Sequence, residues 1–426
     1  MSELAESGGR PFAAWRIAAG SARRWRWSVI GLAVVALLVR ALLIAHSHGG
    51  SDLRNYTYFA RLALAGHDPY LPPAHGAFGA TFADSPPLEY GVFSLLLRLH
   101  DSPTTLRILF AVADAGVILL VGLRWPAPRS WRAAFVVFYA LNPLVLISWT
   151  VYAEDKTLLF LALAVLLLSV AQRRELTSWL AATALTAFKV LGAFLVPALL
   201  VDTVRQDRTR GLRFLAGFVI LVAASSLAWF PDGLRAFTHR NGRLGAYLPI
   251  HSSPMLLVSR IGLYAGFEPT LLAAIAITAV VVLLILRRLE LAEALALSLL
   301  GGYIFLPDDS FGRLLLVALP FMLLVSPTWR QWAAVWVLTT IAAIAAAIET
   351  QGVPHALAPI SGTLRTAFSH ESTVRSVLWL NAPVVAILWT YLVQRRHGST
   401  PSAHSSNEST RPAISTTSAT MITGEP

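Results

Sequence analysis

The sequence contains no cysteine, and charged residues make up only 13% of its 426 residues. Without cysteine the chain has no disulfide, no zinc–thiolate site and no thiol nucleophile. A soluble domain carries about 25% charged residues, whereas this chain is 56% apolar and has too few polar groups to cover a folded surface. These shortages exclude soluble α/β enzymes, disordered scaffolds and disulfide-stapled secreted modules.

Long apolar runs are what the sequence has instead. Runs of about 16 to 20 residues recur from residue 28 to residue 393, and this length is typical of helices that cross a bilayer. The sequence therefore predicts an all-α integral membrane protein with about 12 membrane segments. We expect a basic lead at 1–27, a transmembrane region at 28–396, and a disordered tail at 397–426 that is rich in Ser and Thr.

The basic residues predict an orientation. A net charge of +11 would suggest a nucleic-acid partner in a soluble protein. On the predicted spans, however, the excess of arginine falls on the side of the N-terminus, and the opposite side is close to neutral, which is the positive-inside pattern. We therefore expect a multi-pass plasma-membrane protein with both termini in the cytoplasm, outer segments at 46–103 and 231–269, and no nucleic-acid partner.

The segment 178–201 does not fit a regular pattern of membrane crossings. Arginines precede it (Arg173) and follow it (Arg205), so both of its ends should be cytoplasmic. Its roughly 24 residues give about 36 Å of helix, too short for two crossings. A broken, half-inserted helical hairpin with Lys189 near its apex fits both observations. Irregular backbone at that depth is tolerated only where it lines a cavity or is buried in protein.

Arg40 falls inside the first predicted span and Asp114 inside the second. Counted along their helices at about 1.5 Å per residue, they lie at nearly the same depth. A charge at the centre of a bilayer costs about 2.5 kcal/mol or more unless it is compensated. We expect a buried ion pair between the first two spans. The alternative is that Arg40 extends toward lipid headgroups or a donor phosphate.

The first outer segment holds the leading candidate for a catalytic residue. Asp52 follows the first span by about half a dozen residues, which holds its carboxylate at the lipid–water boundary, and Tyr56 follows one helical turn later. A general base next to an acceptor hydroxyl needs this kind of placement. The alternative is a helix cap or a solvated loop acid. Asp68 in the GHDPY turn is interpreted as a turn cap, and Asp84 and Glu89 as loop charges.

Three stretches together carry a resemblance. The first outer segment combines Asp52 with the turn GHDPY and the run SPPL; the second stretch is ALNPLVLISWTVYAED, and the third is AFKVLGAFLVPALLV. Over about residues 51–201 the chain resembles the GT-C superfamily of glycosyltransferases, above all those that use polyprenyl-phosphate mannose. Gly192 stands near the place where a proline often follows the lysine in that family.

The resemblance implies an inverting enzyme that moves a sugar, mannose first, from a polyprenyl-phosphate donor to a lipid-linked or envelope glycan acceptor on the outer face. It places the catalytic acid at Asp52 and the hairpin lysine at Lys189. Such a transfer needs a base for the acceptor proton and cations for the charge that develops on the leaving phosphate. Lys189 is the leading cation, and Lys156 is expected to matter less. The alternative for Lys189 is a structural ion pair with a carboxylate such as Glu154.

Further candidates rank lower, and for Arg240, Arg313 and His239 the alternative is a solvated loop residue. The candidates are Arg240 and Arg313 as donor-phosphate contacts, and Glu154, Asp155, His239 and Tyr56 as acceptor contacts or supporting residues. The adjacent acids at 154–155 and 308–309 could in principle hold Mg²⁺. Because adjacent acids are common helix caps, and because the resemblance implies a donor class that mostly acts without a metal, we expect no metal and no cofactor.

Two interpretations from other classes compete with the enzyme. A multi-spanning transporter or lipid flippase predicts paired broken helices and a polar site at the midplane, whereas the acids of this chain gather in the outer segments. A non-catalytic membrane scaffold gives no reason for a long aromatic outer segment with an acid at the interface.

Overall fold

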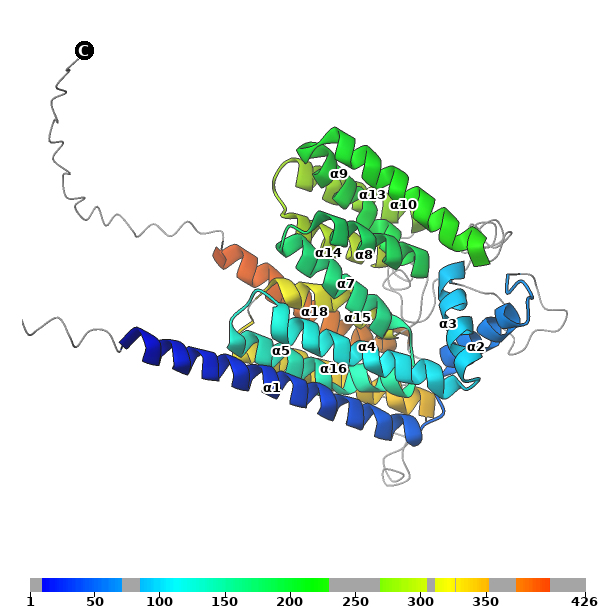
Figure 1. Ribbon diagram of the computed structural model, residues 1–426, viewed down its shortest axis with the longest axis horizontal. Helices are drawn as coiled ribbons and strands as arrows, with labels where there is room; N and C mark the ends of the chain where they lie inside the picture. The colour runs from blue at the N-terminus through cyan, green and yellow to red at the C-terminus, as the bar shows by residue number, and fades with distance from the viewer. Residues whose placement is uncertain are drawn as a thin grey trace, which may run out of the picture.

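The computed structural model describes residues 10–70, 85–229, 269–304, 311–325, 327–351 and 373–398. Throughout these residues the regular structure is helical, which confirms the all-α prediction for them. The helices lie side by side in a bundle, and α2 (Ser51–Leu64) and α3 (Pro87–Leu99) lie at one end of it (Figure 1). The start of α1 and the end of α18 lie at the opposite end.

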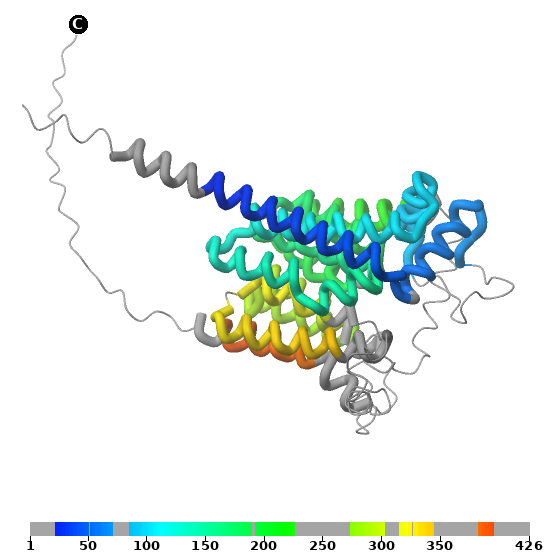
Figure 2. The backbone as a smooth tube through the Cα atoms, turned by 90° about the horizontal axis from the view of Figure 1, so that it is seen from below, coloured from blue at the N-terminus to red at the C-terminus, as the bar shows by residue number. Residues whose placement is uncertain are grey.

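The N-terminal half supplies most of the elements around the end of the bundle that carries α2 and α3. Its remaining elements are α1 (Arg10–Ala45), α4 (Pro103–Arg124), α5 (Arg129–Leu141), α6 (Pro143–Val145), the π-helical turn η1 (Leu146–Val151), α7 (Lys156–Ala171), α8 (Glu175–Phe188), the 3₁₀ turn η2 (Val190–Leu195), α9 (Val196–Gln206) and α10 (Arg208–Trp229). The C-terminal half adds α13 (Pro269–Ile285), α14 (Leu291–Ile304), α15 (Phe311–Leu324), α16 (Trp329–Gln351) and α18 (Thr373–Gly398). Figure 2 shows α1 along one side of the bundle and α16 and α18 on the other.

Local sequence explains where the elements near the site begin. Ser102 accepts a hydrogen bond from the Thr104 backbone N–H, and Pro103 stands at the first helical position, so α4 begins there. The Asn142 side chain accepts from the backbone N–H groups of Leu144 and Val145, and this cap opens α6 after α5 has ended. The two pieces meet at a bend of 41°.

Part of the described chain has helices that are candidates for crossing a membrane. Within the described residues, two helices are long and apolar enough to cross a membrane, Ala22–Ala45 and Pro103–Arg124, or three if the bent pair Arg129–Leu141 and Pro143–Val151 is one span. Four more apolar helices have 10–17 residues, and a crossing takes about 20. These helices support membrane association, whereas a total of about 12 segments stays a prediction.

The predicted break at Lys189 is present. α8 ends there with extended backbone, η2 follows, and α9 leads away. Gly192 lies so close to the backbone of Leu185 and Thr186 that a side chain at this position would collide with it, so glycine allows the chain to turn back against α8. Whether this broken segment enters a bilayer only part way stays a prediction.

The predicted ion pair between Arg40 and Asp114 is confirmed. Arg40 Nε lies 2.6 Å from Asp114 Oδ2, and both side chains are buried. Arg40 also donates to the Ala140 carbonyl at 3.2 Å, and the Tyr139 hydroxyl donates to Asp114 Oδ1 at 2.5 Å. The pair therefore connects α1, α4 and α5.

Replacing Arg40 with methionine should lower the free energy of unfolding by about 3–5 kcal/mol, because the Asp114 carboxylate loses its charged partner inside the bundle. Adding Asp114→Leu removes the unpaired charge and should restore a large part of the loss. Thermal unfolding of the detergent-solubilised protein measures both variants. An Arg40→Met variant as stable as the wild type would show that the pair does not hold the three helices together.

Candidate active site

α2 and α3 lie at one end of the bundle (Figure 1), and charged side chains from four segments meet there. The segments are the first turn of α2, the first turn of α3, the loop that leads into α7, and the break between α8 and η2. They bring together Asp52, Glu89, Glu154, Asp155, Lys156 and Lys189. We call these six residues the charge cluster.

Lys156 lies at the centre of three carboxylates. Its Nζ atom is 3.3 Å from Asp52 Oδ2, 3.3 Å from Glu154 Oε2 and 3.2 Å from Asp155 Oδ1. The lysine side chain is fully buried. A buried ammonium is tolerated only where opposite charges and hydrogen bonds compensate its desolvation, and these carboxylates do so.

Lys189 occupies the other half of the cluster. Its Nζ atom donates to Ser85 Oγ at 2.5 Å and lies 3.3 Å from Glu89 Oε2 and 3.2 Å from Asp155 Oδ2. The Tyr56 hydroxyl donates to Asp155 Oδ1 at 2.9 Å, and Lys189 Nζ lies 5.7 Å from the centre of the Tyr56 ring. Asp155 therefore bridges the two lysines.

Asp52 is the most open carboxylate of the cluster. Its side chain is 37% exposed, whereas that of Glu154 is 8% exposed and those of Asp155 and Glu89 are fully buried. Asp52 lies in the first turn of α2, where the positive end of the helix dipole favours an anion. The Gly50 N–H donates to the Tyr152 carbonyl at 2.9 Å and fixes this turn beside η1.

The motifs of the first outer segment contact one another. The Tyr70 hydroxyl, from the GHDPY turn, donates to the Ser85 carbonyl of the SPPL run at 2.7 Å. Asp68 accepts from the Tyr70 backbone N–H at 2.8 Å, which confirms it as the cap of its turn. Ser85 also binds Lys189, and Asp155 of the second stretch pairs with the same lysine. The three stretches that carry the family resemblance therefore meet at the charge cluster.

Burial raises the pKa of the Glu154 carboxyl from 4.5 to about 7, against the opposing effect of the Lys156 ammonium; the negative charges of Asp52 and Asp155 add to the rise. The cause is that a carboxylate loses its hydration when it is buried, which favours the protonated form. Glu154 therefore exchanges its proton near neutral pH, next to the carboxylate of Asp52.

The shifted carboxyl predicts a pH-dependent stability. Below about pH 4.5 both folded and unfolded chains hold the Glu154 proton; above that, only the folded chain keeps it, so stability should fall as the pH rises toward about 7. The total change is on the order of 3 kcal/mol. Glu154→Gln should flatten the slope of thermal unfolding midpoints between about pH 5 and pH 8. Glu175→Gln, at the other end of the bundle, should keep the slope, and a wild-type profile that rises over this range would contradict the assignment.

The structure places some of the predicted site residues together and does not describe others. The structure brings Asp52, Tyr56, Glu154, Asp155 and Lys189 together, as a shared site requires. His239 and Arg240 lie outside the described residues, as do the acids at 308–309. Arg313 lies in α15, but its side chain is outside the described part. Their proposed roles stay predictions.

One expectation about an individual charge was wrong: Glu89 was interpreted as a loop charge, yet it is buried and paired with Lys189. Lys189 forms ion pairs with Glu89 and Asp155, which agrees with the alternative of a structural pair with a carboxylate. That Lys156 matters less for activity than Lys189 stays a prediction, although the Lys156 ammonium contacts Asp52 itself. One signal pointed to Lys156: it is the first residue of α7, where the helix dipole disfavours a cation unless carboxylates surround it.

Ser85 and Arg107 were also missed. Ser85 bonds to Lys189, and Arg107, buried near the start of α4, donates to the Ile44 carbonyl of α1 and to the Ser47 carbonyl of the α1–α2 connection. Within the described residues no group of three or more His, Asp and Glu is arranged to hold a metal, and the Lys156 ammonium lies among the carboxylates of Asp52, Glu154 and Asp155. That the protein acts without a metal stays a prediction.

No protein-family model matches the sequence, and no curated protein or solved structure matches it either. The resemblance to GT-C glycosyltransferases therefore rests on the quoted motifs.

Proposed function

We propose that the protein is a membrane glycosyltransferase of the GT-C type, with about 12 membrane segments including the broken hairpin around Lys189. It transfers a sugar, mannose first, from a polyprenyl phosphate to a lipid-linked or envelope glycan acceptor on the extracytoplasmic face of the plasma membrane. The observation that supports this most is a partly exposed carboxylate, Asp52, anchored by a buried lysine at the end of apolar helices.

Asp52 acts as the general base in this proposal. The acceptor hydroxyl oxygen attacks the anomeric carbon of the sugar, the bond from that carbon to the phosphate oxygen breaks, and Asp52 takes the hydroxyl proton. The polyprenyl phosphate leaves with the electron pair of the broken bond. Lys156 holds Asp52 through Oδ2, which directs Oδ1 to the acceptor.

The leaving phosphate needs positive charge, and the cluster has four carboxylates but only two lysines. We therefore propose that the donor phosphate replaces one carboxylate contact of Lys189 and that Arg240 and Arg313 supply further charge. Preorganised cations of this kind stabilise a developing anion by about 3–4 kcal/mol each. Glu154, Asp155, Tyr56 and His239 support the base or contact the acceptor.

The test is a transfer assay on the purified full-length protein, reconstituted in vesicles with radiolabelled polyprenyl-phosphate mannose and a membrane lipid extract. The proposal predicts a labelled product that survives extraction and that forms roughly 10²–10⁴-fold more slowly when Asp52 is asparagine. Movement of the intact labelled lipid between leaflets without a covalent product would favour a transporter or flippase. Neither product nor movement would favour a scaffold.

A further inference from the structure

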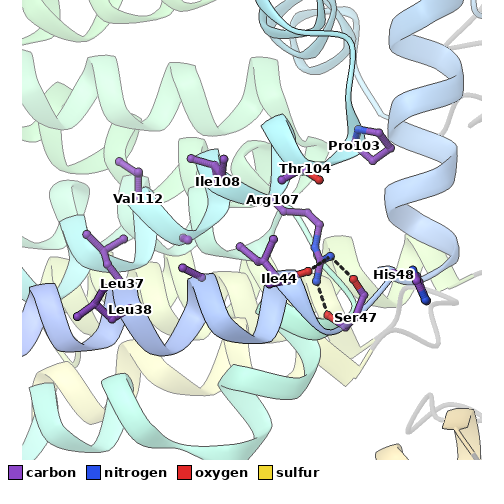
Figure 3. A pocket seen from close by; sticks show the side chains of 13 residues that line it. Leu37, Leu38, Ile44, Ser47, His48, Pro103, Thr104, Arg107, Ile108 and Val112 are labelled. Atoms are coloured by element: carbon purple, nitrogen blue, oxygen red, sulfur yellow. Dashed lines mark hydrogen bonds between the residues drawn. The ribbon is translucent and has the colours of Figure 1, made fainter.

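An apolar groove lies between α1 and α4, away from the charge cluster. Its volume is about 730 Å³. Leu37 and Leu38 of α1 face Ile108 and Val112 of α4 across it, and Ser47, His48 and Arg107 lie at its outer end (Figure 3). Ala41 of α1 also lines the groove. We call it the α1–α4 groove. Leu38 is 60% exposed and Ile108 and Val112 are 54% exposed, so the groove is open along its side.

Arg107 gives the outer end of the groove a positive charge. It is 4% exposed, and within the described part of the chain it donates only to neutral oxygens: the carbonyls of Ile44, Ser47 and Thr150, and the Ser47 hydroxyl. Among the described residues no carboxylate pairs with Arg107, and its buried Nε has no hydrogen-bond partner there. A buried guanidinium without a counter-charge is costly, so the site favours an anion at this end.

The length of the α1–α4 groove indicates which kind of anion fits it. From residue 37 to residue 45 the groove follows α1 for about 12 Å, at 1.5 Å per residue, and Ser47 and His48 extend it beyond the end of the helix. A bilayer has a hydrocarbon core of about 30 Å, so the groove is nearly one leaflet deep. An apolar channel of that depth, with a cation at its polar end, fits a fatty-acyl chain whose headgroup carries a phosphate.

We propose that the α1–α4 groove binds an anionic membrane phospholipid, with one acyl chain along Leu38 and Ala41 and the headgroup phosphate at Arg107. This site goes beyond the proposed function and does not depend on it. A lipid bound there connects α1, α4 and η1 through Arg107, whose guanidinium already joins these three elements.

The test is native mass spectrometry and thermal unfolding of the full-length protein in mild detergent. Phosphatidylglycerol should be retained and should raise the unfolding midpoint, whereas phosphatidylcholine with the same chains should bind about tenfold more weakly, because its headgroup has no net charge for Arg107. Ala41→Trp should abolish retention by filling the groove. Leu42→Trp is the matched control, since Leu42 is the next residue of α1 and is 63% exposed but does not line the groove.

Arg107→Gln should remove the preference for phosphatidylglycerol while leaving weak binding of both lipids. If Arg107→Gln fails to fold, the comparison of Ala41→Trp with Leu42→Trp still tests the proposal. Equal binding of the two lipids to the wild type, or unchanged binding to Ala41→Trp, would overturn the proposal. So would displacement of phosphatidylglycerol by an equal concentration of polyprenyl phosphate, which would assign the groove to the donor chain. None of these readouts uses sugar transfer.

Discussion

Replacing Asp52 with asparagine should lower sugar transfer by roughly 10²–10⁴-fold, the range usual for the loss of a general base. Asparagine keeps the shape of the side chain, and its amide oxygen can still accept from Lys156, which lies 3.3 Å from Asp52 Oδ2. What it loses is the ability to take a proton. Folding and donor binding should therefore stay near normal, as measured by thermal unfolding and by donor titration, while the rate of transfer falls.

Asp68→Asn is the matched control. Asp68 caps the turn before Tyr70 and lies outside the charge cluster, so the change should lower stability by no more than about 1 kcal/mol and should leave transfer nearly unchanged. Equal losses of activity from the two variants would indicate that the first outer segment is only a structural element.

Replacing Lys189 with methionine should lower transfer by roughly 10²–10³-fold if its ammonium stabilises the leaving phosphate. Lys189→Arg need not restore activity, because a planar guanidinium differs from an ammonium in shape and hydration. The contacts with Glu89 and Asp155 make a structural role the competing explanation. Single-turnover rates with saturating donor measure the effect.

The double variant Lys189→Met with Glu89→Gln separates the two explanations. Lys189→Met leaves the Glu89 carboxylate without its cation. Glu89→Gln removes that negative charge, so the stability of the double variant should recover. If Lys189 contacts the donor, transfer stays low in the double variant; if it is only a structural partner, transfer recovers with stability. Lys156→Met should differ from both, because it leaves three carboxylates without their shared cation and should mainly destabilise the protein.

Helix positions were predictable because they depend on local sequence. The apolar runs at about 104–123, 156–170 and 212–230 of the sequence lie close to α4 (Pro103–Arg124), α7 (Lys156–Ala171) and α10 (Arg208–Trp229). The depths of Arg40 and Asp114 follow from counting along helices, and the break at Lys189 follows from arginines on both sides of a short apolar stretch.

The partners of the cluster residues were not predictable, because they come from segments about 100 residues apart. Lys189 meets Ser85 and Glu89, and Lys156 meets Asp52, only through the packing of α2 and α3 against the ends of α7 and α8. The sequence gives the composition of such a cluster but not its pairing. Arg107 was missed for the same reason, since its partners are backbone carbonyls of distant segments.

Chemical rescue tests the role of Asp52 most directly. Asp52→Ala should transfer sugar slowly, and added formate should restore part of the rate, because the side chain that it replaces is 37% exposed and a small carboxylate can enter the space and take the acceptor proton. Asp68→Ala should not respond to formate. A well-folded Asp52→Ala protein that transfers at the wild-type rate without formate would contradict the assignment of Asp52 as the general base.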